Sequence, residues 1–144
     1  MDTKIGTIVD TKGGSVESVD SGVMVREAVA RMNEKNIGSV LVLDGDRLVG
    51  IFTERDVLTR IVAAMRDPAQ VRVGEVMTRQ MIVIERGTTV AQAMSLMTTR
   101  RCRHLPVLDG GKVIGLISIG DLTRWVIHDQ ERSITDLTDY IHRA

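Results

Sequence analysis

The sequence is poor in the residues that mark several large classes of function. It holds one Phe, one Trp and one Tyr, whereas single-stranded nucleic acids are bound by stacking bases on successive aromatic rings. The single cysteine, Cys102, excludes an internal disulfide and a cysteine-only metal cage, and it suits a reducing compartment. Basic and acidic residues balance at 19 each, so the net charge indicates neither a nucleic-acid arm nor an acidic tail. Any binding chemistry must come from local clusters.

Long apolar segments and the common phosphate and zinc motifs are missing as well. No run approaches the roughly 18 apolar residues of a membrane span, and the N-terminal residues 1–4 open no apolar signal region. Neither a Gly-Lys-Ser/Thr phosphate loop nor a zinc-ligand spacing occurs. We therefore expect a soluble cytoplasmic protein that holds no metal.

What the sequence does contain is an internal repeat. The segment GIFTERD at 50–56 recurs 65 residues later as GLISIGD at 115–121, and many apolar positions are related by the same offset without a gap. The two copies lie at 16–65 and 81–130.

Apolar spacing within each copy changes from strand-like to helix-like and back. Residues 81–84 predict a strand, and Thr89 with Gln92 predicts a capping box at the start of a helix. Two further strands surround an Asp-Gly turn at 44–45 and again at 109–110, and a second helix follows. The repeated unit is therefore predicted to be β-α-β-β-α.

One such unit has too little core to be stable alone, so we expect the two copies to pack together. The predicted fold is mixed α/β (α+β), with two β-α-β-β-α copies related by approximate two-fold symmetry in one globule. We assign 1–68 to the first copy with an N-terminal strand, 69–130 to the second copy and 131–144 to a C-terminal helix.

The C-terminal helix has its own pattern. Ser133 and Asp136 resemble another capping box, and an apolar stripe follows on the same segment. The stripe consists of Ile134, Leu137 and Ile141. It is predicted either to close the core or to contact a second copy of the chain.

The most informative residues are Thr53 with Asp56 and their counterparts Ser118 with Asp121. A hydroxyl followed three residues later by an acid is favoured at any helix start. The same position, after a buried strand, points backbone N–H groups at a ligand, and a carboxylate there can accept both hydroxyls of a ribose. The residues alone leave a plain cap and an adenosine-type site both open.

The repeat resembles a pair of CBS domains, known as a Bateman module. The likeness rests on the Gly-x-x-Thr/Ser-x-x-Asp elements, on RHLPV at 103–107 and on a Val-x-x-Ala-x-x-x-Met helix in each copy. It covers nearly the whole chain, and 119–140 resembles the small stand-alone bacterial members. The resemblance implies a non-enzymatic regulatory protein in signal transduction, often a disc-like homodimer, with a protein target that the sequence does not name.

The resemblance also implies an adenine nucleotide, AMP first and otherwise ADP, ATP, NAD or S-adenosylmethionine, bound in clefts between the copies. By position, one cleft would combine Ile51, Thr53, Asp56, Gln80, Met81, Ile82, Cys102, Arg103 and His104. The other would combine Leu116, Ser118, Asp121, Ser15, Val16, Glu17, Ile37, Gly38 and Ser39. Asp56 and Asp121 would hold the ribose.

The two clefts are not expected to be equivalent. Arg103 and His104 supply the Asp56 cleft with donors for a phosphate, whereas Gly38 and Ser39 at the matching positions carry no charge. We therefore predict tighter binding of a phosphorylated ligand in the Asp56 cleft. Lys12 and Thr78 are candidate accessories there.

Three other functions are weighed against this one. In a structural or oligomerisation module with vestigial sites, the two acids would only be caps. A nucleic-acid binder would use the cluster at 100–104. An enzyme is disfavoured because no nucleophile or carboxylate neighbours His104 in the sequence. Cys102 is interpreted as a small buried side chain, although Arg101 and Arg103 could lower its pKa.

Overall fold

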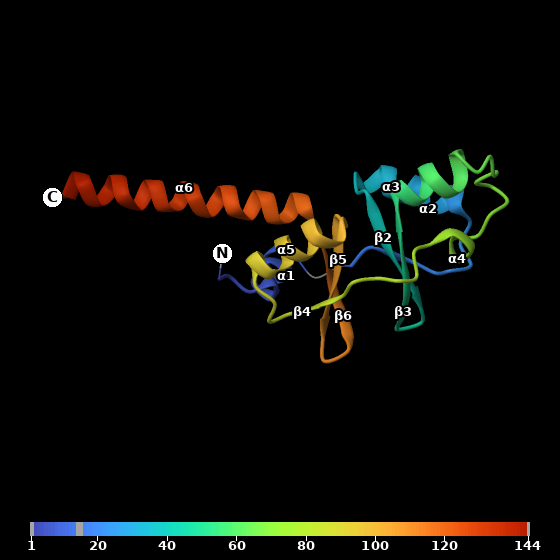
Figure 1. The fold of residues 1–144 in the computed structure, drawn as a ribbon, viewed down its shortest axis with the longest axis horizontal. Helices are drawn as coiled ribbons and strands as arrows, with labels where there is room; N and C mark the ends of the chain where they lie inside the picture. Colours follow the sequence, from blue (N-terminus) through green and yellow to red (C-terminus); the bar gives the residue numbers. More distant parts are fainter. Residues whose placement is uncertain (1, 14–15, 144) are drawn as a thin grey trace.

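A computed structural model describes residues 2–13 and 16–143, except for the side chains at 136, 139, 140, 142 and 143. Each copy of the repeat forms a three-stranded sheet (Figure 1). The strands of the first sheet are β1 (Ser18–Val19), β2 (Ser39–Asp44) and β3 (Arg47–Thr53), and those of the second are β4 (Ile84–Glu85), β5 (His104–Asp109) and β6 (Lys112–Ser118). In both sheets the strands lie in chain order, the first pair parallel and the second antiparallel.

Helices connect and follow these strands as the repeat predicts. The first helix of each copy is α2 (Val25–Lys35) or α5 (Val90–Arg100), and the second is α3 (Glu54–Asp56) continued by the π-helix η1 (Val57–Val62), or α6 (Ile119–Arg143). Two further helices, α1 (Ile5–Lys12) and α4 (Val73–Val76), precede the copies. The predicted mixed fold of two β-α-β-β-α units is confirmed. None of the described helices is both long and apolar enough to cross a membrane.

The two copies agree in backbone detail at the 65-residue offset. α2 and α5 both end in a left-handed residue, Asn36 and Arg101, each with φ of 54°. The hairpin turns contain Gly45 and Gly110 at φ of 64° and 59°, a conformation that glycine adopts without the steric cost of a Cβ. The capping box of Thr89 with Gln92 is present as predicted.

The halves exchange the segments that precede them. Ile5 of α1 is fully buried in the core of the second half, and its backbone N–H donates to Thr88 O at 2.8 Å. In return, Val73 of α4 is buried in the core of the first half, and Val71 O accepts from Val25 N at 2.8 Å. The halves are therefore interlocked rather than simply stacked.

The crossing segment passes so close to β3 that it requires a glycine there. A Cβ on Gly50 would lie 2.5 Å from Met77 Sδ and 3.0 Å from the carbonyl oxygen of Thr78. Ile51 and Thr78 exchange backbone hydrogen bonds of 3.0 and 2.8 Å beside this contact. Gly50 thus fixes the chain that leads into one of the clefts described below.

The first copy has its strand β1 at Ser18–Val19, preceded by the helix α1, which was not predicted. One prediction about the early part of the second copy needs correction. The strand predicted over 81–84 is formed only by Ile84–Glu85, because 81–82 line a cavity and 81–83 pair with no strand. The boundaries at 68 and 130 remain predictions about the repeat. Because α1 and α4 are exchanged, each hydrophobic core contains a helix that the sequence boundaries assign to the other copy.

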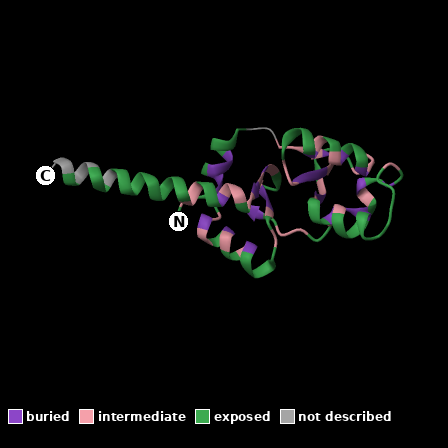
Figure 2. Ribbon diagram, turned by 90° about the horizontal axis from the view of Figure 1, so that it is seen from above, coloured by how far each residue is buried: buried purple, intermediate pink, exposed green. Residues whose placement is uncertain are grey.

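The structure corrects one prediction for the C-terminal segment and decides between the two alternatives for its stripe. α6 runs without a break through the expected capping box, and Ser133 Oγ donates to Asp129 O instead of capping a new helix. The stripe does not close the core, because Ile134, Leu137 and Ile141 are 64, 63 and 68% exposed. Figures 1 and 2 show this part of α6 projecting away from both sheets.

Candidate functional site

Asp56 lies at the junction of β3 and α3 and is almost fully buried, with 5% of its surface exposed. Its backbone N–H donates to Thr53 Oγ1 at 3.2 Å, and Thr53 N donates back to Asp56 Oδ2 at 3.0 Å. This is a complete capping box, which explains why these residue types start the helix. A capping role for Asp56 is therefore established.

The second oxygen of Asp56 contacts Thr78, from the segment that crosses between the halves, and Arg60, from η1 of the same half. Thr78 Oγ1 donates to Asp56 Oδ1 at 2.9 Å, and Arg60 Nε lies 3.9 Å from the same oxygen. A carboxylate offers about four acceptor positions, and Oδ2 also accepts from Thr53 Oγ1 at 3.2 Å, so one position remains on Oδ1 for another hydrogen bond. Asp56 can thus cap its helix and still accept a bond from a ligand.

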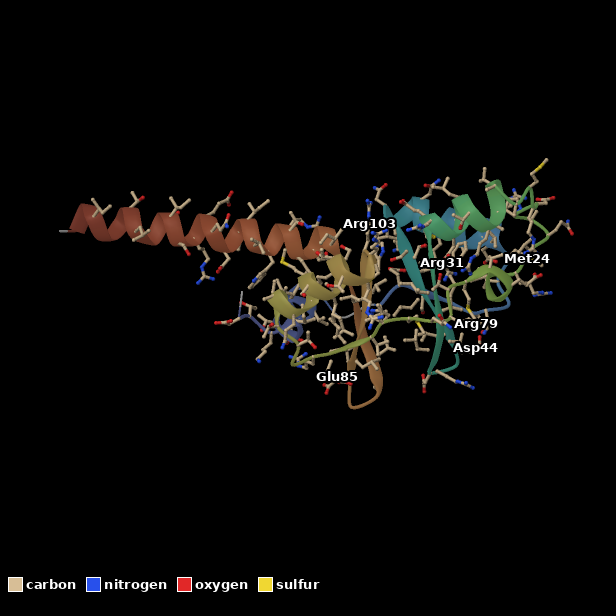
Figure 3. All side chains as sticks on the ribbon, viewed as in Figure 1. Met24, Arg31, Asp44, Arg79, Glu85 and Arg103 are labelled. Carbon is tan, nitrogen blue, oxygen red and sulfur yellow. The ribbon has the colours of Figure 1, made fainter. Side chains whose placement is uncertain are left out.

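A cavity opens beside each of the two acids, with a volume of about 470 Å³ at Asp56 and about 480 Å³ at Asp121. Every residue assigned to the Asp56 cleft lines this cavity, and so does Thr78. They are Ile51, Thr53, Asp56, Gln80, Met81, Ile82, Cys102, Arg103 and His104. Sequence reasoning did not include Arg55, Arg100 and Arg101, which add positive charge to the same wall. Arg103 follows α5 where the two halves meet (Figure 3).

Asp121 repeats the arrangement at the start of α6. Ser118 N donates to Asp121 Oδ2 at 2.8 Å, and Asp121 N donates to Ser118 Oγ at 3.1 Å. Lys12 Nζ lies 2.8 Å from Oδ2, and Arg124 donates to Oδ1 at 2.8 Å. Burial raises the pKa of Asp121, but the hydrogen bonds from Lys12 and Ser118 outweigh it, so the pKa lies below its ordinary value.

The Asp121 cavity, of about 480 Å³, brings together the described residues assigned to the second cleft. They are Leu116, Ser118, Asp121, Val16, Glu17, Ile37, Gly38 and Ser39. Ser15 lies outside the described residues. Arg124 and Asn36 also line the cavity and were missed, although Arg124 stands three residues after Asp121 and so faces it on the helix.

Lys12 belongs to the Asp121 cleft, not to the Asp56 cleft where the sequence placed it. Besides Asp121, it donates to Leu116 O at 3.0 Å. The physical reason is the exchange of segments, which places the end of α1 on the second half. Gly38 and Ser39 line the Asp121 cleft without charge, but Lys12 and Arg124 supply it with two cations that were not assigned to it.

His104 lies between the clefts and lines both cavities, as does Gly38. Burial lowers the pKa of His104, and the nearby carboxylates of Asp121 and Glu54 offset this only in part. The imidazole is therefore neutral at neutral pH. A charged ligand in either cavity would therefore change the pKa of His104.

Two other predicted features have different surroundings from those expected. Burial raises the pKa of the Cys102 thiol, which contradicts the lowering that neighbouring arginines suggested. The basic cluster at 100–104 faces the Asp56 cavity rather than forming an open stripe. No group of three or more side chains suited to a metal ion lies among the residues that the structure describes.

Comparison with known proteins agrees with this geometry. The CBS domain family matches residues 8–63 and 73–128. The CBS domain-containing protein CBSX3, mitochondrial, of Arabidopsis thaliana is 34% identical over 96% of this chain and 72% of its own length. The structure of a CBS-domain protein from Burkholderia ambifaria MC40-6 is 44% identical with a TM-score of 0.85, covering 89% of this chain and 96% of that one.

A hexameric CBS-CP12 protein from bloom-forming cyanobacteria is 28% identical with a TM-score of 0.75, over 85% of this chain and 67% of that one. Some CBS-domain proteins therefore form oligomers. Tandem CBS proteins are typically regulatory or signal-transduction proteins. This chain belongs to the CBS-domain family and carries two CBS domains in tandem.

Proposed function

We propose that the protein is a non-enzymatic sensor of adenine nucleotides, with AMP as the first candidate. The observation that carries the proposal is the duplicated acid, buried at Asp56 and partly buried at Asp121, each beside a cavity of about 470–480 Å³ that both halves line. Cavities of about 300–1,000 Å³ are the size that small-molecule ligands occupy. ADP, ATP, NAD and S-adenosylmethionine share the adenosine portion and remain alternatives.

Asp56 and Asp121 accept the ribose hydroxyls in this proposal, and cationic side chains bind the phosphate. Arg103 carries that role in the Asp56 cleft through charge-assisted hydrogen bonds, with His104 as a donor once it is protonated. The Asp56 cleft binds first, because four arginines line it, whereas Lys12 and Arg124 of the Asp121 cleft are paired with Asp121. A ligand in the Asp121 cleft must first displace these bonds.

Binding becomes a signal because each cavity is lined by both halves. A ligand shifts the packing of the halves by its difference in affinity for the two arrangements. We propose that a cytoplasmic homodimer passes this change to a protein target. Val62 of η1 and its repeat equivalent Ile127 of α6 support a homodimer, since both are apolar and at least half exposed.

The second candidate is a structural module whose acids only cap helices. One observation favours it, namely that the reciprocal hydrogen bonds of Thr53 with Asp56 account for both residue types without a ligand. The two candidates differ in what the acid contributes beyond stability.

Isothermal titration of AMP into the wild type and Asp56→Ala separates them. Loss of the cap lowers stability by about 1 kcal/mol in either case, but only a ribose acceptor also loses AMP affinity. The matched control is Gln92→Ala, which removes the capping box of α5. We expect Asp56→Ala to lose AMP binding and Gln92→Ala to keep it; equal affinity in the three proteins overturns the sensor proposal.

A further inference from the structure

α6 is the place where the second copy departs from the first. The helix of the first copy ends at Val62 of η1, whereas α6 continues for sixteen residues past the equivalent position, Ile127, to Arg143. The continuation is not needed to complete the repeat. It carries three apolar side chains that are each more than 60% exposed, Ile134, Leu137 and Ile141.

These side chains share one face of the helix with Ile127, which is 50% exposed. Ile127, Ile134 and Ile141 are spaced by seven residues, and Leu137 follows Ile134 by three, so they form a continuous stripe. We name these four residues the α6 stripe. A coiled coil between two α6 helices needs such a pattern over at least three or four heptads, and the stripe covers two.

The first half carries an apolar groove at the other end of the molecule. It has a volume of about 280 Å³, and α2 and η1 with the turn after η1 form its walls. Its apolar lining includes Val29, Ile61, Val62 and Met65, of which Met65 is 92% exposed. We name it the η1 groove. Figure 1 places α6 and η1 at opposite ends, so the stripe does not lie on the groove of its own chain.

Charges at the two surfaces are complementary. Arg26 and Arg66 line the η1 groove, and Arg66 also pairs with Glu75 of its own chain at 3.2 Å. Glu131 lies on the face of the α6 stripe, four residues after Ile127 and three before Ile134. Arg132, five residues after Ile127, lies on the opposite side of the helix.

We infer that the η1 groove of one chain receives the α6 stripe of a second copy. In Figure 1, α6 and the green helix next to α3, which is η1, both run along the upper side of the molecule. In the proposed dimer a two-fold axis across this side pairs each stripe with the groove of the other chain. Each chain contributes one stripe and one groove, so the assembly is complete with two chains. This inference rests on the homodimer proposed above and states how that homodimer is held.

Sedimentation velocity of the full chain tests the inference with Ile134→Lys in the stripe and Met65→Lys in the groove. Both residues are exposed in the single chain, so neither change disturbs its core, which circular dichroism checks. We expect the wild type to be a dimer and each variant to dissociate with an affinity at least about tenfold lower, because a lysine is buried against apolar side chains. Thr135→Lys, exposed on α6 beside the stripe, is the matched control and should remain dimeric.

Mixing the two variants distinguishes this contact from pairing between α6 helices. A chain with Ile134→Lys keeps its groove, and a chain with Met65→Lys keeps its stripe, so the mixture regains one of the two contacts and associates more strongly than either variant alone. A Met65→Lys protein as dimeric as the wild type overturns the inference but leaves the homodimer intact. A monomeric wild type overturns both, while titration of AMP into the same sample still reports on nucleotide sensing.

Discussion

Thr78 Oγ1 donates a 2.9 Å hydrogen bond to Asp56 Oδ1, although the two residues are separated by 22 positions. Its counterpart in the other cleft is the 2.8 Å contact from Lys12 Nζ to Asp121 Oδ2. In both clefts, one of the residues that contact the acid comes from the segment that has crossed between the halves. A ligand bound to either acid would therefore contact a segment that links the two halves.

The close passage over β3 predicts that Gly50→Ala is destabilising. The added methyl group lies against Met77 and the Thr78 carbonyl, and the carbonyl is backbone that cannot easily move. We expect a loss of about 1–3 kcal/mol in the free energy of unfolding, measured by urea denaturation. Gly87→Ala, with no neighbour within 4 Å among the described residues, is the control. Equal stability of the two variants would show that the passage is looser than described.

The exchange of segments predicts that α1 stabilises the second half. Ile5 is fully buried there, so Ile5→Ala should cost about 2–5 kcal/mol of unfolding free energy. Thr7→Ala, on the exposed side of α1, should change stability by less than about 0.5 kcal/mol. Hydrogen exchange should show faster opening in the second half. If Ile5→Ala matches Thr7→Ala, α1 does not contribute to that core.

The Lys12 contact predicts a pH dependence of stability. The lowered pKa of Asp121 contributes stability that is present above its ordinary value of 3.8 and lost as the pH falls through the folded-state pKa. Lys12→Met should cost up to about 1 kcal/mol at neutral pH, since Lys12 is itself partly exposed, and less once the pH falls below the folded-state pKa of Asp121. Lys35→Met, whose nearest acid Glu17 lies at 4.0 Å, is the control. A cost for Lys12→Met that is independent of pH would contradict the assignment.

His104 predicts a response to ligand in either cleft. Burial keeps its pKa below 6.5, so its contribution to stability is present above pH 6.5 and lost as the pH falls toward the folded-state pKa. A bound phosphate should raise this pKa, and NMR titration of the imidazole with and without AMP measures the change. The ring of His128, exposed on α6, should not respond. An unchanged His104 pKa at saturating AMP would place the phosphate away from it.

The units of the fold could be predicted because their signals are local. The spacing of apolar residues sets each strand and helix, and Thr89 with Gln92 fixes a helix start through bonds within one turn. The exchange of segments is non-local, and no residue near Ile5 indicates which half it joins. The apolar spacing of Ile5 with Ile8 and Val9 indicates a helix. It does not indicate that this helix packs in the core of the second half.

The same limit explains what was missed in the clefts. Asp56 and Asp121 stand in repeated motifs, so their positions at helix starts could be predicted. Lys12 was assigned to the wrong cleft because that depends on how α1 crosses. Arg124 could have been found from its distance of three residues to Asp121. Sequence patterns thus located both acids and Arg103, but not Arg124 or the cleft to which Lys12 belongs.

The interlocking of the halves suggests how such a chain could arise. If the polypeptide were interrupted between η1 and α4, each piece would still place one helix, α1 or α4, in the core of the other. Two chains exchange segments in the same way in a domain-swapped dimer. The covalent link then only replaces an association between molecules with one inside a molecule. Duplication and fusion of a gene for a single copy would therefore retain this exchange of segments.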